Sequence, residues 1–327
     1  MHLPDLHIQT SYSDGLEPVD SFVKVAKWKG INEIGIADHY SLWHKMNTTE
    51  KFLRYLLELQ NYPVYVGVEM DIGHELPLFP NMKKNLDFVL AGLHRLHGKR
   101  LFFLDSVSLE SPKKFVKEIL EIMMIAMEKR YFDVLAHATQ LPPSLKGQNK
   151  ILFTDDWIEE LISSAADRNI AIELNCGMKL PDEDFIRKCI HKGLKIAVGS
   201  SAHKSDDVGE LDYAKRVLRK LEVEEDQIYL PKKIRKKLDY TAYIKEAVLI
   251  GQKLNLKINL DSETDIKDLE LAIFYDKEGR VGKRIIVPSQ KYLELVSNQF
   301  IFEYAPDKVE IRLYYESEVL DKVLLLK

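Results

Sequence analysis

The sequence DLHIQTSYSDG at residues 5–15 is the stretch from which the fold of this chain can be predicted. Residues 3–8 are typical of a short buried strand, and polar residues gather at its end. His7 and Gln9 are two positions apart, so on an extended strand they share one face. The turn that follows returns the Asp14 carboxylate toward that face. Similar polar residues follow other apolar runs of the chain, and this recurrence supports a functional interpretation of the first stretch.

Up to about residue 222, short apolar runs alternate with amphipathic helical patterns. Strands are predicted at 34–37, 62–68, 88–93, 131–135, 170–174 and 194–199, and helices at 16–29, 48–60, 112–129, 155–169, 182–192 and 208–221. Apolar strands separated by helices favour parallel strands covered by helices. Seven such units can close into a barrel, whose functional residues lie at the C-terminal ends of the strands.

The pattern changes after residue 222. Residues 223–254 are charged and predicted to be helical, and the basic run at 232–237 is interpreted as a solvated linker face. From residue 253 the apolar residues alternate, residues 276–279 are typical of a hairpin turn, and strands are predicted at 281–287, 300–304, 309–314 and 319–326. We therefore expect an α/β domain at residues 1–228. Residues 229–327 should form a helical linker and an all-β, sandwich-like accessory domain without a catalytic constellation.

Composition narrows the class of protein. The chain has 327 residues, of which 46% are hydrophobic and 30% charged, as in a folded globular protein. A net charge of -4 gives no strong signal for nucleic-acid or anionic-membrane binding. No signal peptide is recognised, and no apolar run approaches the roughly 20 residues that span a bilayer. Cys176 and Cys189 are the only cysteines, which fits a cytoplasmic setting and excludes a zinc–thiolate site. The sequence leaves open whether the chain forms a homo-oligomer.

Side chains with metal-binding atoms stand at or just after the predicted strands: His7, Asp14, His39, Glu69, His94, His137 and His203. Imidazoles and carboxylates without a thiolate suit zinc, manganese or iron. The set exceeds what one tetrahedral ion needs, so we expect two or three divalent ions that share bridging groups. Clustered ions can clamp a phosphoryl oxygen and generate hydroxide from water, which favours hydrolysis of a phosphate ester.

The same stretches resemble, in chain order, the motifs of the polymerase-and-histidinol-phosphatase (PHP) family. DLHIQTSYSDG is similar to its first motif, DxHxHTxxSDG; IADHY, GVEM, GLHRLHG and LAHAT are similar to the next four; and GSSAHK is similar to the last, GSDAH. The resemblance covers about residues 5–203. It implies a distorted seven-stranded β/α barrel that holds up to three metal ions and acts on phosphoesters, with a small phosphorylated molecule as the substrate.

The resemblance also implies how the donors are shared. One ion would be held by Asp14, His39 and His203, a second by Glu69, His94 and His137, and a third by His7 with Glu69 as the bridge. Gln9 stands where the second His of HxH is expected, and Ser201 where the Asp of GSDAH is expected. Both departures fall on the third cluster. An amide oxygen and a hydroxyl are weak donors, so we expect this ion to bind poorly or not at all.

Three further residues are candidate catalytic groups. His97 is a candidate general acid or phosphate contact, with a loop histidine as the alternative. Arg95 and Lys204 are candidates to neutralise a phosphate, with a solvated or salt-bridged cation as the alternative. His44 is expected in a surface loop in preference to the pocket mouth. Glu173 is expected to orient a ligand or to form a buried ion pair.

These observations predict a metal-dependent phosphoesterase that uses a metal-activated hydroxide. The alternative is a catalytically weak or silent barrel of the same type that acts as a binding or regulatory module. Gln9 and Ser201 are the sequence features that separate the two hypotheses. An oligonucleotide phosphodiesterase would need a basic groove beside the site, which the overall charge does not indicate.

Overall fold

The computed structural model describes residues 2–101, 111–233, 240–266, 269–275, 280–287, 290–296, 300–302, 306–315 and 318–326. The chain divides into two compact units. Unit 1 comprises Met1–Asn47, Asn61–Leu76 and Leu86–Ile234. Unit 2 comprises Thr48–Gln60, Pro77–Asn85 and Arg235–Lys327, so it takes two segments from the first half of the chain.

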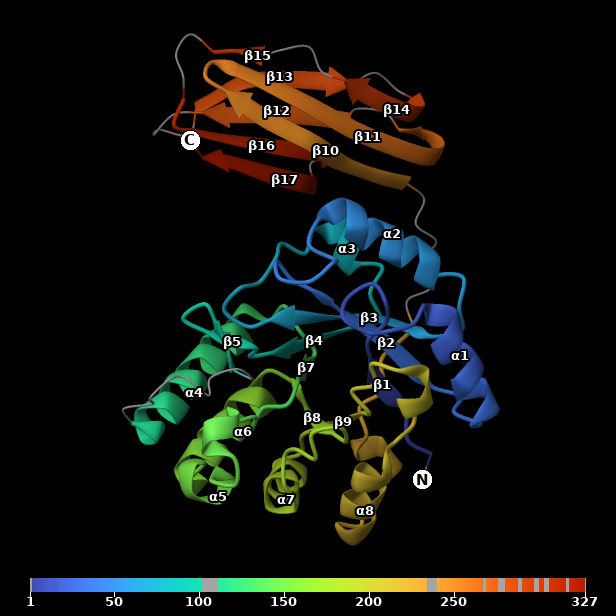
Figure 1. Ribbon diagram of the computed structural model, residues 1–327, viewed down its shortest axis with the longest axis vertical. Coiled ribbons are helices and arrows are strands. Elements are labelled where there is room, and N and C mark those ends of the chain that lie inside the picture. Colours follow the sequence, from blue (N-terminus) through green and yellow to red (C-terminus); the bar gives the residue numbers. More distant parts are fainter. Residues whose placement is uncertain are drawn as a thin grey trace. The chain divides into compact units, whose positions relative to one another are not determined.

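Unit 1 is built on a sheet of parallel strands in the order β1-β2-β3-β4-β7-β8-β9 (Figure 1). Within the described residues these are β1 (Asp5–Ile8), β2 (Ile34–Tyr40), β3 (Tyr65–Asp71), β4 (Phe88–Gly92), β7 (Val134–Leu135), β8 (Ala171–Asn175) and β9 (Ile196–Gly199). Ile8 forms a parallel bridge with Ala202, and the Gln9 N–H donates to the Ala202 carbonyl over 2.9 Å. The sheet thus nearly closes on itself, and the predicted seven-stranded β/α barrel is confirmed.

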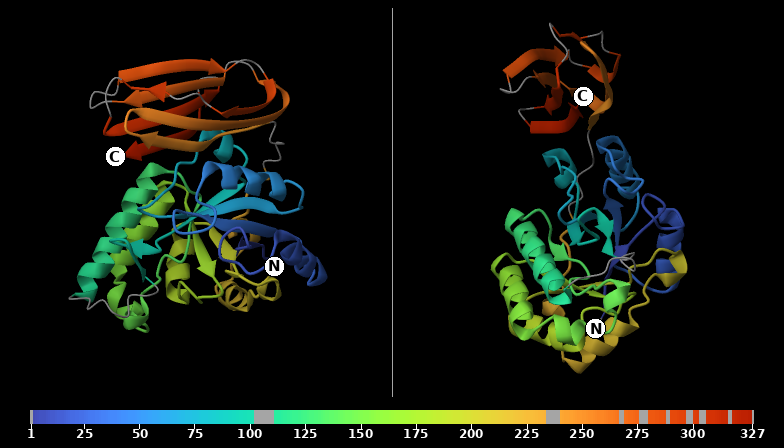
Figure 2. Two further views of the ribbon diagram at one scale, coloured as in Figure 1. Left: turned by 45° about the horizontal axis from the view of Figure 1, so that its top comes forward. Right: turned by 60° about the vertical axis from the view of Figure 1, so that its left-hand side comes forward.

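Helices cover the outside of these strands (Figure 2). They are α1 (Val19–Trp28), α4 (Pro112–Lys129), α5 (Asn149–Leu152), α6 (Asp155–Asp167), α7 (Glu183–His191) and α8 (Asp212–Lys220). Side chains cap three of them: Ser111 accepts from the third residue of α4, Thr154 does so for α6, and Asp182 for α7. Such caps satisfy backbone N–H groups that have no partner inside the helix. No helix among the described residues is long and apolar enough to cross a membrane.

The barrel interior is filled around Phe88. The phenyl ring lies where two neighbouring strands carry glycine: a Cβ built on Gly67 would lie 2.4 Å from Phe88 Cζ, and one built on Gly35 would lie 2.8 Å from it. Small residues pack around the ring, and the cluster comprises Leu6, Ala37, Tyr65, Phe88, Leu90, Val134, Ala136, Ala171 and Ala197. The glycines on β2 and β3 therefore make room for one large aromatic side chain inside the barrel.

We expect Gly67→Ala to destabilise the protein by about 1–3 kcal/mol, because the new methyl group overpacks against Phe88. Adding Phe88→Leu to the same chain should recover part of this loss. Urea denaturation of the two single variants and the double variant gives the coupling free energy. Strictly additive losses would show that the glycine serves some purpose other than room for the ring.

Unit 2 contains two antiparallel sheets. One has the order β10-β11-β14 with β15 on β11, and the other β13-β12-β16-β17. The strands are β10 (Tyr240–Ile250), β11 (Lys253–Ile266), β12 (Leu269–Tyr275), β13 (Arg280–Val287), β14 (Gln290–Val296), β15 (Phe300–Ile301), β16 (Lys308–Tyr315) and β17 (Glu318–Leu326). Alternate residues of β11, such as Leu256 and Ile258, share one core with Ile311 and Leu313 of β16. The predicted all-β, sandwich-like region is confirmed.

Two helices from the first half of the chain belong to unit 2: α2 (Thr49–Leu59) and α3 (Pro80–Lys83). The Thr49 hydroxyl donates to Asp321 Oδ1 over 2.7 Å, and the Ile244 N–H donates to Asp321 Oδ2 over 2.7 Å. Asp321 is buried, and burial raises the pKa of its carboxyl group. This carboxylate joins the start of α2 to two strands of the sandwich.

The predicted helix at 223–254 is wrong within the described residues. The one helix within residues 223–233 is the short 3-10 helix η4 (Glu225–Gln227), and β10 begins at Tyr240. The pairing of β10 with β11 shifts register between Ile244 and Glu246. A bulge of this kind breaks the two-residue alternation, so the strand loses its sequence signature. The predicted hairpin turn at 276–279 and most of the basic run lie outside the described residues.

Candidate metal centre

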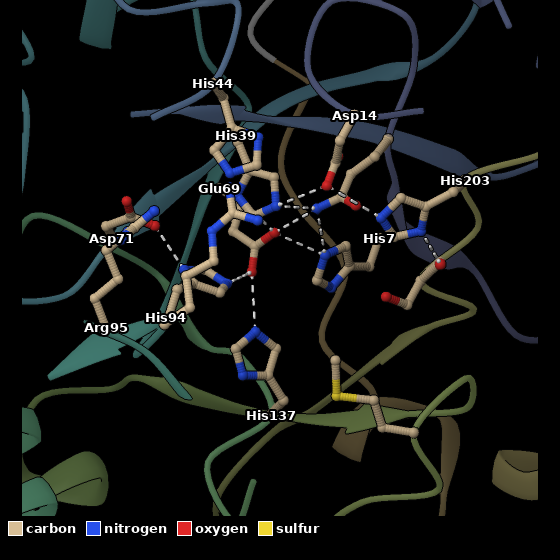
Figure 3. A pocket seen from close by; sticks show the side chains of 14 residues that line it. His7, Asp14, His39, His44, Glu69, Asp71, His94, Arg95, His137 and His203 are labelled. Atoms are coloured by element: carbon tan, nitrogen blue, oxygen red, sulfur yellow. Dashed lines mark hydrogen bonds and ion pairs between the residues drawn. The ribbon is translucent and has the colours of Figure 1, made fainter. Parts of the chain in front are cut away.

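Polar side chains from the barrel strands converge on one pocket at the C-terminal ends of the strands (Figure 3). Its volume is about 330 Å³. The structure brings together here every side chain predicted to donate to a metal, along with Gln9 and Ser201: His7, Asp14, His39, Glu69, His94, His137 and His203. The barrel geometry explains this meeting, because parallel strands end at the same rim.

Glu69 is the centre of this cluster. Its Oε1 atom lies 3.1 Å from Nε2 of both His94 and His137, and its Oε2 atom lies 3.0 Å from Nε2 of His7. The side chain is only 1% exposed. Burial by itself raises the pKa of Glu69, but the surrounding imidazoles, His7 foremost, hold it well below its usual value. A buried carboxylate ringed by ring nitrogens can act as a bridge between cations.

A second carboxylate stands behind each of two imidazoles. Glu173 Oε1 lies 2.5 Å from His7 Nδ1, and Asp71 Oδ1 lies 2.6 Å from His94 Nδ1. With Nδ1 donating to a carboxylate, Nε2 faces the pocket, and this is the nitrogen through which such an imidazole would bind a metal ion. Burial lowers the pKa of His94, but Glu69 and Asp71 together raise it to about 10. The surplus of negative charge favours a cation at Nε2.

Asp14 forms the second part of the cluster. Its Oδ2 atom lies 3.5 Å from His203 Nε2 and 3.8 Å from His39 Nε2. Burial lowers the pKa of His39 to about 3, so this imidazole is in the neutral, metal-binding form at neutral pH. His44 stacks on His39 with 4.0 Å between ring centroids and lines the pocket. The expectation that His44 lies in a surface loop away from the site is therefore wrong.

The side chain of Gln9 lies between these two parts. Its amide Nε2 donates to Glu69 Oε2 over 2.6 Å and to His39 Nε2 over 2.9 Å. Its Oε1 atom is buried and has no hydrogen-bond partner within the part of the chain that the structure describes. Ser201 also lines the pocket, with a φ of 57° in the left-handed region. A non-glycine residue held there often belongs to a functional site.

Buried carboxylates hold the loops that carry these ligands. Asp38 Oδ1 accepts from the Thr10 N–H over 2.7 Å and from the Ser13 hydroxyl over 2.6 Å, which fixes the turn before Asp14. Burial raises the pKa of Asp38 to about 6. On the other side, Asp5 accepts from the Ser200 N–H over 2.8 Å, next to Ser201. Neither Asp5 nor Asp38 is among the predicted site residues, because the backbone and hydroxyl groups that they accept from lie 25 or more residues away in the sequence.

The three candidate catalytic residues differ in whether they line the pocket. Arg95 lines the pocket, and its guanidinium group lies 4.1 Å from the centroid of the Trp43 indole. His97 does not line it: the side chain is 74% exposed, and Nε2 lies 2.7 Å from Glu118 Oε1. Lys204 is exposed and also does not line it. The structure therefore gives His97 and Lys204 no place at this pocket, and of the three candidates it brings only Arg95 to it.

Asp71 is the residue that sequence reasoning missed and that bears most on the ligands. It is buried, and it also accepts from the Ser41 hydroxyl. The strand before Glu69 was predicted to end at residue 68, whereas β3 continues to Asp71. Residues two apart on a strand share a face, so a longer strand would have placed Asp71 beside Glu69.

We expect Asp71→Asn to weaken metal affinity by about 10- to 100-fold, because the charge that orients His94 is lost while the amide keeps the shape. Competition with a chelating dye measures this affinity. Asp20→Asn is the matched control, since Asp20 is a half-exposed partner of Lys24 on α1. An unchanged affinity for the Asp71 variant would contradict the orienting role.

A parallel β/α barrel that gathers imidazoles and carboxylates at its strand ends defines a class of metal-binding barrels. The donor set fits divalent ions, because the carboxylates behind His7 and His94 turn ring nitrogens toward Glu69. The PHP domain model matches residues 5–177, just over half of the chain. The chain belongs to the PHP domain family.

Several known proteins are similar to this chain. The probable histidinol-phosphatase of Clostridium acetobutylicum is 26% identical over 227 residues, which are 63% of this chain and 88% of that protein. A probable phosphatase of Thermoanaerobacter sp. is 27% identical over 244 residues, 68% of this chain and 88% of that protein. The DNA polymerase/3′-5′ exonuclease PolX of Bacillus subtilis is 24% identical over 229 residues, 66% of this chain but 37% of that protein.

One solved structure with a similar fold is histidinol phosphate phosphatase from Lactococcus lactis, complexed with zinc, L-histidinol and phosphate. It aligns with a TM-score of 0.58 at 16% identity and covers 72% of this chain and 98% of its own. At this identity the similarity shows the fold, and it agrees with the barrel described above.

Proposed function

We propose that this chain is a metal-dependent phosphoesterase that hydrolyses a small phosphorylated substrate. The observation that carries the proposal is the convergence of His7, His94 and His137 on the buried Glu69, within 3.0–3.1 Å. Burying so many titratable groups around one carboxylate costs stability unless cations share the site. The names of the similar proteins, several of them phosphatases, support a phosphoester as the substrate.

Two ligand sets would hold the ions. Asp14, His39 and His203 would hold one, and Glu69, His94 and His137 the other, with zinc, manganese or iron as the candidates. His7 and Glu69 offer a third position, which Gln9 and Ser201 weaken. When bound, such ions supply a nucleophile by lowering the pKa of water and offset the charge that develops on the phosphoryl group.

The chain's own residues would prepare the site for this chemistry. Glu173 and Asp71 fix the ring orientation of His7 and His94, so that the ligands need not reorganise. Arg95 at the pocket wall would offset negative charge on the substrate. None of these roles needs His97 or Lys204.

An activity screen of the whole chain tests the proposal. The protein would be loaded in turn with zinc, manganese and ferrous iron and assayed on a broad panel of phosphomonoesters and phosphodiesters. We expect turnover with at least one ion and its loss on treatment with a chelator. A protein shown by elemental analysis to hold its ions, yet silent on the whole panel, would favour the binding or regulatory module instead.

A further inference from the structure

A two-stranded ribbon places two arginine residues side by side at the wall of the metal pocket. The strands are β5 (Arg95–Leu96) and β6 (Lys99–Arg100), directly after the ligand His94. The pairing is antiparallel, and Arg95 is the register partner of Arg100. Both arginines line the pocket that also contains Glu69. The ribbon thus presents two guanidinium groups to the space where a substrate would lie.

This pairing is electrostatically unfavourable by itself. Like charges directly opposite each other on neighbouring strands destabilise the pair. An anion between the two groups would remove the repulsion. Charge-assisted, bidentate hydrogen bonds from arginine to phosphate or carboxylate are among the strongest that proteins form.

A neighbouring aromatic ring and a backbone carbonyl hold Arg95 in position. Its guanidinium group lies over the indole of Trp43, 4.1 Å from the ring centroid, and Nη1 donates to the Gly98 carbonyl over 3.0 Å. His74 meets the same indole edge-on, with 4.8 Å between centroids. A cation stacked in this way is ordered before a ligand arrives, which lowers the entropy cost of binding.

The ribbon lies to one side of the metal ligands. Figure 3 shows Arg95 beside His94 and Asp71, with His203 on the far side of Glu69. A phosphoryl group that is hydrolysed must lie against the ions, within reach of Glu69 and Asp14. A second anionic group on the same substrate would then extend toward the ribbon.

We propose that Arg95 and Arg100 together bind a second anionic group of the substrate, a phosphate or a carboxylate, in addition to the phosphoryl group that is hydrolysed. This inference rests on the proposed function and narrows its substrate class to phosphoesters with two anionic groups. It also separates this chain from a histidinol phosphatase, because histidinol carries an amine and an imidazole but no second anion. Two guanidinium groups would repel that amine.

Matched substrates test the inference. Fructose 1,6-bisphosphate is compared with fructose 6-phosphate for a second phosphate, and 3-phosphoglycerate with glycerol 3-phosphate for a carboxylate. In one of these two pairs, we expect the metal-loaded protein to have a higher kcat/KM for the substrate that carries two anionic groups. Arg100→Gln should reduce that preference by about ten- to a hundredfold, because it removes a charge-assisted contact. Lys99→Gln, on the same ribbon but outside the pocket lining, is the control and should keep the preference.

Three outcomes would overturn the inference. If Arg100→Gln lowers kcat/KM equally for both members of each pair, the arginines contact the hydrolysed phosphoryl group. The proposed function would then survive. A protein that shows no preference for a second anion would also contradict it. If no substrate turns over, the proposed function fails, and calorimetric binding of the same compounds decides the inference. Tighter binding of the doubly anionic member, lost in Arg100→Gln, supports it; equal binding overturns it.

Discussion

Glu69→Gln is expected to lower kcat by about a thousandfold and to reduce the metal content of the purified protein. The two carboxylate oxygens of Glu69 lie 3.0–3.1 Å from Nε2 of His7, His94 and His137. The amide keeps the shape but loses the charge and one acceptor, so it can no longer bridge two cations. A loss of about 4 kcal/mol of transition-state stabilisation corresponds to this factor.

Glu159→Gln is the matched control, because it makes the same chemical change on the exposed face of α6. Glu159 Oε1 pairs with Lys192 Nζ over 2.7 Å, far along the chain from every ligand. Kinetic assays and elemental analysis of both variants should show a change in the Glu69 variant alone. Near-normal turnover with full metal content after Glu69→Gln would remove Glu69 from the metal centre.

The double variant Gln9→His with Ser201→Asp is expected to bind one additional ion per chain, three instead of two. Gln9 Nε2 already lies 2.6 Å from Glu69 Oε2 and 2.9 Å from His39 Nε2, so an imidazole at this position would reach the same ligands. Ser201 has a φ of 57°, a conformation that aspartate adopts more readily than most residues. The backbone therefore need not move to accept the new carboxylate.

Elemental analysis of the two single variants and the double variant measures the added ion. The single variants should give intermediate occupancy, because each restores one donor of the pair. Unchanged stoichiometry in the double variant would show that the third position is not formed by these two residues. The assignment of Asp14 and Glu69 to the other two ions would be unaffected.

Much of unit 1 follows from local sequence patterns. The barrel strands are continuous apolar runs, and their ligands stand at strand ends, where a parallel barrel must bring them together. His7 and Gln9 were placed on one face by alternation alone, and the structure puts both at the same carboxylate. The side of the strand on which a residue lies is a short-range property, so the sequence is enough to predict it.

Other features depend on contacts that no local pattern contains. The bulge near Ile244 is set by pairing with β11. Because it breaks the two-residue alternation, the sequence of this strand predicts a helix. The end of β3 is set by its neighbours β2 and β4, which extend it to Asp71. The place of α2 in unit 2 depends on Thr49 meeting Asp321, 272 residues away. The direction of His97 depends on Glu118, which lies on α4.

The most direct test of the metal centre is a crystal structure of the protein grown with zinc or manganese, with anomalous diffraction recorded at the absorption edge of the ion. We expect one anomalous peak bounded by Asp14, His39 and His203 and a second bounded by Glu69, His94 and His137, with metal–ligand distances of about 2.0–2.2 Å for zinc. Crystals that contain the metal but show no peak within the pocket would contradict it.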